Sequence, residues 1–155
     1  MPTANLIPKI ISINISRGGI PKLPVDSIHV TMAGLEGDGH NHVKHYSLLQ
    51  AVCIQDLEKL EELSQNGYRL SPGQAGENLT AQNLDVNDLP LGTILKFSSG
   101  VELEISKVRN PCYVMDAIHP QLKFDALKRH GMYAKVLREG IISVGEIIQV
   151  MKPFL

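Results

Sequence analysis

The chain lacks the features that mark a disulfide-rich, zinc-binding or membrane-spanning protein. Its two cysteines, Cys53 and Cys112, are too few for a disulfide framework and lack Cys-x-x-Cys spacing. Sparse cysteine is typical of a reducing cytosol, so we expect a cytoplasmic protein. Residues 1–10 lack the basic start and long apolar core of a signal peptide, and no apolar run approaches the length that spans a bilayer.

An excess of charge of one sign is lacking as well. Fifteen lysines and arginines stand against 16 aspartates and glutamates, which gives a formal net charge of −1. A nucleic-acid-binding surface needs a broad basic excess, and an acidic tail would indicate a charged partner. We therefore expect neither nucleic acid nor a membrane among the partners. The length of 155 residues fits one domain over 1–155, with its core at about 9–150.

What the sequence does contain is a series of short extended stretches. Residues 9–15 alternate in hydropathy, which predicts a strand with Ile11, Ile13 and Ile15 on one face. Further stretches of this kind cover residues 26–32, 93–97, 101–106, 132–137 and 141–150. Thirteen glycines and nine prolines supply turns between them. This pattern predicts a mainly β fold, a closed barrel or sandwich.

Helical patterns are short by comparison. Asp56 suits the N-cap of a helix over 57–65, in which leucines three residues apart form one stripe and Gly67 follows the end. A weaker helical pattern covers residues 121–130. We expect these helices to be peripheral to the strands.

Cys112 follows a predicted strand that ends at Pro111. A thiolate, rather than a thiol, performs nucleophilic and soft-metal chemistry, and a nearby cation favours the thiolate. Arg109 and Lys107 lie close by in the sequence, and Pro111 interrupts strand pairing, which would place the cysteine at a rim. The alternative is a buried structural thiol, as predicted for Cys53 between apolar neighbours. These residues alone support the two alternatives about equally.

Three of the six histidines fall within residues 40–45. In an extended segment His40 and His42 point the same way, and imidazole is a common metal ligand. A cupin barrel adds a glutamate four residues after such a pair, where this chain has Tyr46. A polar, glycine-rich loop is therefore favoured over a metal site that would include His45.

Two glycine-rich stretches offer binding loops. Residues 72–80 place Glu77 and Asn78 after glycines that allow a ligand to approach the backbone, although a tight turn is equally supported. Residues 16–22 set backbone N–H groups between Arg17 and Lys22, which suits an anion such as phosphate. An ordinary solvated loop explains this second stretch equally well.

Taken in order, these stretches resemble the MOSC domain, the C-terminal domain of molybdenum-cofactor sulfurases. The resemblance covers about residues 9–150, and its most specific parts are Gly76-Glu77-Asn78 and the Arg-x-Pro-Cys at 109–112. It implies a closed β-barrel, similar to the pyruvate kinase barrel, with a few short peripheral helices. It also implies a role with the molybdenum cofactor, a molybdenum–pyranopterin.

The resemblance further implies roles for single residues. Cys112 matches the cysteine that ligates molybdenum in the family's amidoxime reductases, so it is expected to be both the catalytic residue and the metal ligand. The polar loops would hold the pterin and its phosphate, or orient one another around them. The residues expected to do so are Arg17, Lys22, Asp38, His40, Lys44, Gly76, Glu77, Asn78 and Arg109.

The chain also departs from the larger family members. Nothing in it could form the pyridoxal-phosphate domain that mobilises sulfur in the sulfurases, or the additional N-terminal β domain of the amidoxime reductases. Many MOSC chains follow Gly-Asp with His-Gly-Gly, where residues 40–45 here read HNHVKH. We therefore expect a short, stand-alone MOSC protein of the bacterial type.

Three hypotheses of function follow. The leading one is a protein that binds the molybdenum cofactor and handles it, or its sulfur, through Cys112, with reduction of N-hydroxylated substrates as a further activity. The second is a non-catalytic carrier that passes the cofactor to a molybdoenzyme client. The third is a cupin-like metalloprotein that uses His40, His42 and His45. The first two predict a sulfur donor, a client enzyme or an electron-donor protein as partner.

Overall fold

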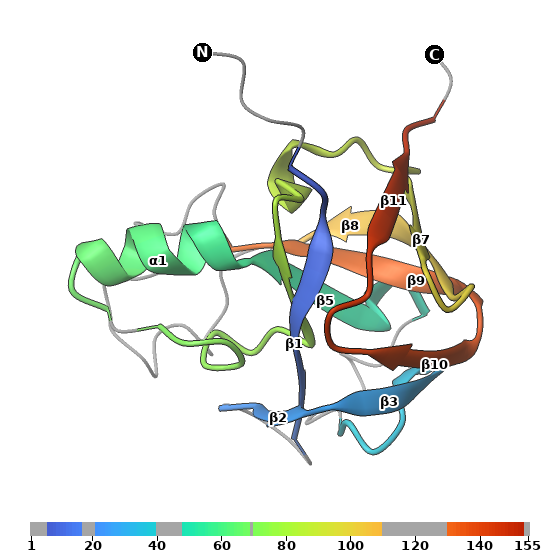
Figure 1. The fold of residues 1–155 in the computed structure, drawn as a ribbon, viewed down its shortest axis with the longest axis horizontal. Helices are drawn as coiled ribbons and strands as arrows, with labels where there is room; N and C mark the ends of the chain where they lie inside the picture. The colour runs from blue at the N-terminus through green and yellow to red at the C-terminus, as the bar shows by residue number, and fades with distance from the viewer. Residues whose placement is uncertain (1–5, 17–20, 40–47, 69, 110–129, 154–155) are drawn as a thin grey trace.

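The structure is a computed structural model, and it describes residues 6–16, 21–39, 48–68, 70–109 and 130–153. Its strands form a larger and a smaller sheet, and one α-helix projects from the strands on one side (Figure 1). The expectation of a mainly β protein is confirmed. Within these ranges no helix is long and apolar enough to cross a bilayer.

Eight strands form the larger sheet. They are β1 (Lys9–Ile15), β2 (Leu23–Val25), β5 (Val52–Asp56), β6 (Leu79–Gln82), β7 (Ile94–Phe97), β8 (Glu102–Val108), β9 (Met132–Arg138) and β11 (Ile148–Met151). Their order is β11-β7-β8-β9-β5-β6-β1-β2, and all neighbours are antiparallel except β5 and β6. A parallel pair requires a crossover, and α1 (Leu57–Gln65) begins it directly after β5.

Three strands form the smaller sheet, in the order β10-β3-β4. They are β3 (Ser27–Thr31), β4 (Gly34–Leu35) and β10 (Gly140–Ser143), and both pairs are antiparallel. β10 follows β9 after a single residue and so connects the two sheets. Two short 3-10 helices, η2 (Leu48–Gln50) and η3 (Val86–Asp88), complete the described elements.

The expected closed barrel is not what the described strands form. The two edges of the larger sheet, β2 and β11, are not paired with each other. Instead β1 approaches the segment before β11 through one bridge, Lys9 to Ile147, and a few backbone hydrogen bonds such as Ile10 N–H to the Glu146 carbonyl at 2.9 Å. The strands therefore curl towards closure without a continuous ladder across it.

Two details of the predicted strands are wrong. In β1 the pairing with β6 shifts between Ile10 and Ser12, so a bulge breaks the alternation, and Ile10 and Ile13 are the core residues while Ile11 is only partly buried. The stretch 141–150 is two strands rather than one. The chain turns at Gly145, which has a φ of +94°, a conformation that residues other than glycine rarely adopt.

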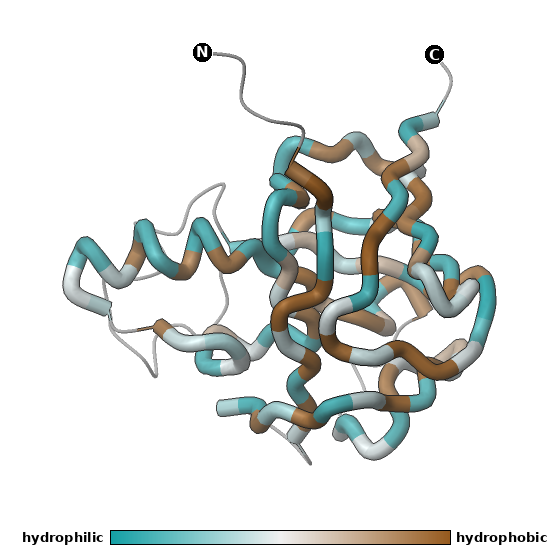
Figure 2. The backbone as a smooth tube through the Cα atoms, in the orientation of Figure 1, coloured by the Kyte–Doolittle hydropathy of each residue, from teal (hydrophilic) through white to brown (hydrophobic). Residues whose placement is uncertain are grey.

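Residues from both sheets form the main core, to which the smaller sheet contributes Val30 and Ile142. Ile13, Val52, Leu95, Ile105 and Ala134 are fully buried and come from five different strands of the larger sheet. Each large apolar side chain of this kind stabilises the fold by about 1.5–3 kcal/mol relative to exposure. Hydrophobic segments follow the inner strands in Figure 2. All five residues of β5 are buried, because β5 lies in the interior of the larger sheet.

Helix α1 covers a second, smaller core. Leu60 and Leu63 are buried and pack with Leu70 and Ala75, as the leucine spacing predicts. Asp56 occupies the N-cap position, but its side chain makes no capping hydrogen bond. Its Oδ2 accepts instead from the backbone N–H of Val86 in η3, at 2.9 Å.

Candidate functional site

Asp38, which follows β4, is the centre of a partly buried polar cluster. Its two carboxylate oxygens accept from Nζ of Lys22 at 2.8 and 2.9 Å. Oδ1 also accepts from the backbone N–H of Ser16 at 3.0 Å, and Oδ2 from Nδ2 of Asn78 at 2.9 Å. A carboxylate offers about four lone-pair positions, so these bonds saturate it. Asp38 therefore joins three segments of the chain to one another.

Asn78 ties the turn before β6 to two strands. Its Oδ1 accepts from the backbone N–H of Cys53 at 3.0 Å, and its own N–H donates to the Cys53 carbonyl at 2.9 Å. Its Nδ2 also donates to the carbonyl of Asn14 in β1 at 3.3 Å. The Asn78 amide is thus engaged at both ends within the fold.

Glu77, the preceding residue, is fully buried and differs from its neighbours. Its Oε2 accepts from the hydroxyl of Thr80 at 2.8 Å, whereas its Oε1 accepts no hydrogen bond from any residue that the structure describes. Burial raises the pKa of the Glu77 carboxyl above its ordinary value, although the backbone of Gly73, the Thr80 hydroxyl and the charge of Arg109 act in the opposite direction. Glu77 can therefore hold a proton, and its Oε1 is the carboxyl oxygen left without a hydrogen bond from the described residues.

Arg109 contacts the same turn and is also buried. One of its terminal nitrogens donates to the carbonyl of Ala75 at 2.6 Å, and the other donates to the carbonyl of His130 at 3.3 Å. Its charge also attracts the Glu77 carboxylate. The guanidinium thus holds the turn around Glu77 to the start of β9.

The glycines of this turn serve the chain's own packing. Gly73 and Gly76 have φ values of +87° and +85°. A Cβ atom on Gly73 would collide with the carbonyl oxygen of Lys22, and the N–H of Lys22 donates to the Gly73 carbonyl at 2.9 Å. At Gly73 the close backbone approach predicted for a ligand is therefore made by the chain itself.

Residues from both predicted glycine-rich stretches thus meet Asp38 and Arg109 in the structure. Lys22, Asp38 and Asn78 bond directly, while Gly76 and Glu77 belong to the turn that Arg109 contacts. The other predicted site residues, Arg17, His40, Lys44 and Cys112, lie outside the described residues. The same holds for His42, His45 and residues 121–129 of the expected helix over 121–130.

Sequence reasoning missed the polar residues inside the strands. Asn14 is fully buried, and its Nδ2 donates to the Thr80 hydroxyl at 3.1 Å while its Oδ1 accepts from the Ser12 hydroxyl at 2.6 Å. A hydrogen-bonded chain therefore runs from Ser12 through Asn14 and Thr80 to Glu77. The available signal was an asparagine between isoleucines in residues 9–15.

Glu77, Asn78, Thr80 and Arg109 lie in the part of the chain that matches a known family, whereas the cluster residues from Ser12 to Asp38 precede it. Residues 41–149 match the model of the MOSC domain, and the chain belongs to the MOSC domain family. The family is associated with molybdenum-cofactor-related function. A comparison with curated proteins gives no match.

Solved structures share the fold. The YuaD protein from Bacillus subtilis aligns with a TM-score of 0.80 and 19% identity, over 96% of this chain and 98% of that chain. YiiM from Geobacillus stearothermophilus gives a TM-score of 0.77 and 26% identity, over 94% of this chain and 75% of that chain. YiiM from Escherichia coli gives a TM-score of 0.73 and 21% identity, over 96% of this chain and 71% of that chain.

The described residues allow a test of how a molybdenum–pyranopterin would fit. In the described ranges no group of three or more histidine, cysteine, aspartate or glutamate side chains could hold a metal ion. The unpaired Oε1 of Glu77 suits a pterin N–H, or a pterin acceptor when the carboxyl is protonated. Asp38 and Asn78 fit the other predicted role, which was to orient the loops. The donor set is therefore compatible with the organic part of such a cofactor.

Proposed function

We propose that this protein binds the molybdenum cofactor, or a closely related pterin, and handles the cofactor or its sulfur through Cys112. The observation that supports this most is the Glu77 carboxyl. It is fully buried in the turn that carries Gly76-Glu77-Asn78, and one of its oxygens accepts nothing from the described residues. Burying such a group is costly, and so perturbed carboxyls are concentrated at functional sites.

Most of the predicted site residues have a direct role in this proposal. Glu77 hydrogen-bonds the pterin, while Asp38 and Asn78 keep the loops around it in place. Cys112 provides a soft thiolate ligand, which suits molybdenum or a sulfane sulfur. The phosphate is held by cations and by donors of the glycine-rich loops, namely Arg17, Lys22, His40 and Lys44. When bound, the cofactor supplies a redox-active metal centre with sulfur ligands.

Mass and metal analysis of protein purified from a host that makes the cofactor tests the proposal. We expect molybdenum and pterin to accompany the wild type, and Cys112→Ser to lose most of the metal. Cys53→Ala is the matched control, because Cys53 lies on β5 and is 5% exposed. Absence of pterin from the wild type, or equal molybdenum in Cys112→Ser, would contradict the proposal. Zinc or iron alone would favour the histidine site.

Glu77→Gln tests the residue that carries the argument. Glutamine keeps the shape and can still accept from Thr80, but it cannot ionise. We expect about tenfold weaker pterin retention, equivalent to about 1.4 kcal/mol, with little change in melting temperature. A lower melting temperature with unchanged retention would show that Glu77 only builds the turn.

Turnover of a simple amidoxime with a reductant distinguishes an enzyme from a carrier. The product amidine is formed when the N–O bond is reduced with two electrons and two protons, and water leaves. An enzyme would use an electron-donor protein as partner and lose this activity in Cys112→Ser. A carrier would show no turnover but would restore activity to an apo-molybdoenzyme client, and a sulfurase-like protein would need a sulfur donor to do so.

A further inference from the structure

Asn87, in the 3-10 helix η3, pairs with the backbone of a residue 44 positions away. Its Nδ2 donates to the carbonyl of Gly131 at 3.0 Å, and its Oδ1 accepts from the N–H of Gly131 at 3.0 Å. A side-chain amide has one acceptor and one donor group. The Asn87 amide therefore makes the same pair of reciprocal hydrogen bonds with Gly131 that two backbone residues make across neighbouring β-strands. Both polar groups of Gly131 are thereby satisfied by a single side chain.

Gly131 can take part in this pairing only because it lacks a side chain. Its φ is +89°, and a Cβ atom there would collide with the carbonyl oxygen of Ile54 in β5. The peptide around Gly131 is therefore pressed against β5 on one side and held by Asn87 on the other. This fixes the position of the His130 carbonyl, which precedes Gly131 directly.

The His130 carbonyl is one of the two acceptors that orient Arg109. The guanidinium donates to His130 at 3.3 Å and to Ala75 at 2.6 Å, and it attracts the carboxylate of Glu77. An arginine fork oriented by two fixed carbonyls has little freedom to turn. The placement of Arg109, and through it of the turn around Glu77, thus depends on where the 130–131 peptide lies.

The contacts from Asn87 through Gly131 and His130 to Arg109 form one connection, and its Asn87 end is also anchored. The N–H of Val86, next to Asn87, donates to the buried carboxyl of Asp56 at 2.9 Å, and the N–H of Asp88 donates to the carbonyl of Asp85 at 3.0 Å. The η3 helix is therefore fixed to the end of β5, and Asn87 projects from a supported position.

We propose that Asn87 is a positioning residue for the Glu77 site, acting through Gly131, His130 and Arg109. Its significance for cofactor handling rests on the function proposed above. The connection itself does not, because it can be measured on the purified protein without any cofactor. Failure of the connection and failure of the proposed function are therefore distinguishable.

Asn87→Ala tests the connection, with Asn83→Ala as the matched control. Asn83 lies shortly before η3 and has a φ of +64°, so alanine there strains the backbone, but among the described residues its side chain donates to the carbonyl of Ile7, at 3.3 Å, and not to Gly131. Both changes therefore lower stability, and only one of them touches Gly131. Asn87→Asp is a second variant, which keeps the acceptor for the Gly131 N–H but replaces the donor to the Gly131 carbonyl with an acceptor oxygen.

The first readout is amide hydrogen exchange of residues 73–78, measured at denaturant concentrations that give the variants equal global stability. We expect exchange there to be at least about threefold faster in both Asn87 variants than in Asn83→Ala. Equal exchange in the two alanine variants would overturn the proposal.

The second readout is a carbon-13 NMR titration of the Glu77 carboxyl, assigned with Glu77→Gln. If Asn87 positions Arg109, its loss moves the guanidinium away from the carboxylate, and the pKa of Glu77 shifts further upward. Asn83→Ala should leave this pKa unchanged. A residue with only a structural role would lower stability without moving the titration, and that outcome would also overturn the proposal.

Discussion

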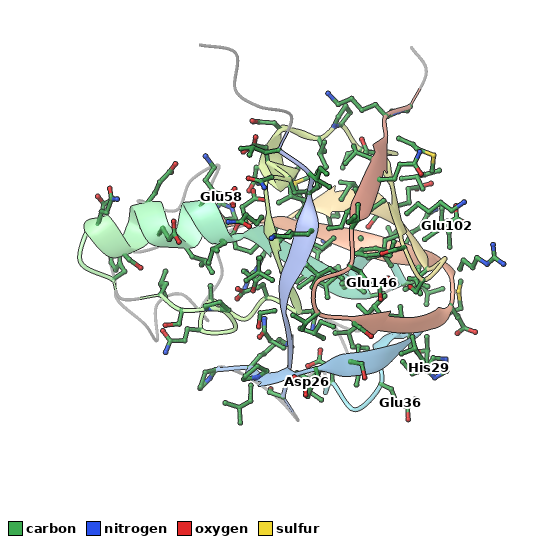
Figure 3. All side chains as sticks on the ribbon, in the orientation of Figure 1. Asp26, His29, Glu36, Glu58, Glu102 and Glu146 are labelled. Carbon is green, nitrogen blue, oxygen red and sulfur yellow. The ribbon has the colours of Figure 1, made fainter. Side chains whose placement is uncertain are left out.

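At the scale of single residues, the fold contains carboxyl groups that are buried away from water. Asp56 is almost completely buried, and its Oδ1 accepts no hydrogen bond from the described residues. Burial raises its pKa to about 7, and the negative charges of Glu58 and Asp85 act in the same direction. Glu58 lies at the start of α1, as Figure 3 shows, and its Oε2 accepts from the N–H of Asn83 at 2.8 Å. The two carboxyls hold the turn over 83–86 from one side.

Asp56→Asn should therefore change how stability depends on pH. An acid whose pKa is higher in the folded than in the unfolded state favours folding below its unfolded pKa, and this contribution is lost as the pH rises from about 4 to about 7. Asparagine removes the cost of ionisation, so the variant should be more stable than the wild type by roughly 1–3 kcal/mol at pH 8, with the difference disappearing towards pH 4. Urea unfolding across this range measures it. The exposed Asp26, labelled in Figure 3, provides the control Asp26→Asn, whose curve should follow the wild type. A constant difference in stability between Asp56→Asn and the wild type at all pH values would contradict the raised pKa of Asp56.

At the scale of elements, several of the strands could be predicted from the sequence because alternation and turn residues are local, whereas β2, β4 and β6 were not among the predicted stretches. Residues 9–15 and 132–137 match β1 and β9 closely. The details that local patterns could not supply depend on partners distant in the sequence. The bulge in β1 exists only in its pairing with β6, and the helix cap expected of Asp56 is replaced by a bond to Val86, thirty positions away.

The turn over 73–76 gives the prediction that belongs to this scale. Gly73→Ala must adopt a positive φ and also displace the carbonyl of Lys22, whereas Gly100→Ala, in the β7–β8 hairpin, has a φ of +99° with no atom within 4 Å of the new Cβ. Backbone strain alone should cost Gly100→Ala about 1 kcal/mol, and the collision should cost Gly73→Ala roughly 1–3 kcal/mol more. Thermal and urea unfolding of the two variants measures this. Equal losses would mean that the contact between the turn and Lys22 adapts easily.

At the scale of the whole molecule, the candidate site is assembled by contacts between distant parts of the chain. Asn14 and Glu77 are 63 positions apart, Asp38 and Asn78 are 40 apart, and Arg109 reaches Ala75 across 34. Family resemblance could therefore name the residues of the site, but only the fold shows which of them bond to one another. Asp38, predicted to hold the pterin or to orient its loop, is saturated by internal donors.

The two cysteines report on the molecule as a whole. Cys53 lies on β5, between β6 and β9, and is 5% exposed, so an alkylating reagent can reach it only when the larger sheet opens. In the native protein Cys53 should label more slowly than Cys112 by a factor on the order of 10³, since a stable domain opens globally only rarely. Added urea should accelerate the labelling of Cys53 in step with the loss of global stability. The labelling of Cys112 should be much less affected, because the predicted place of Cys112 at a strand end requires no such opening. Mass spectrometry of peptides after brief labelling measures both rates. If Cys53 labelled as fast as Cys112 in the absence of urea, β5 would not lie in a stable sheet interior, and the reactivity assigned to Cys112 would lose its physical basis.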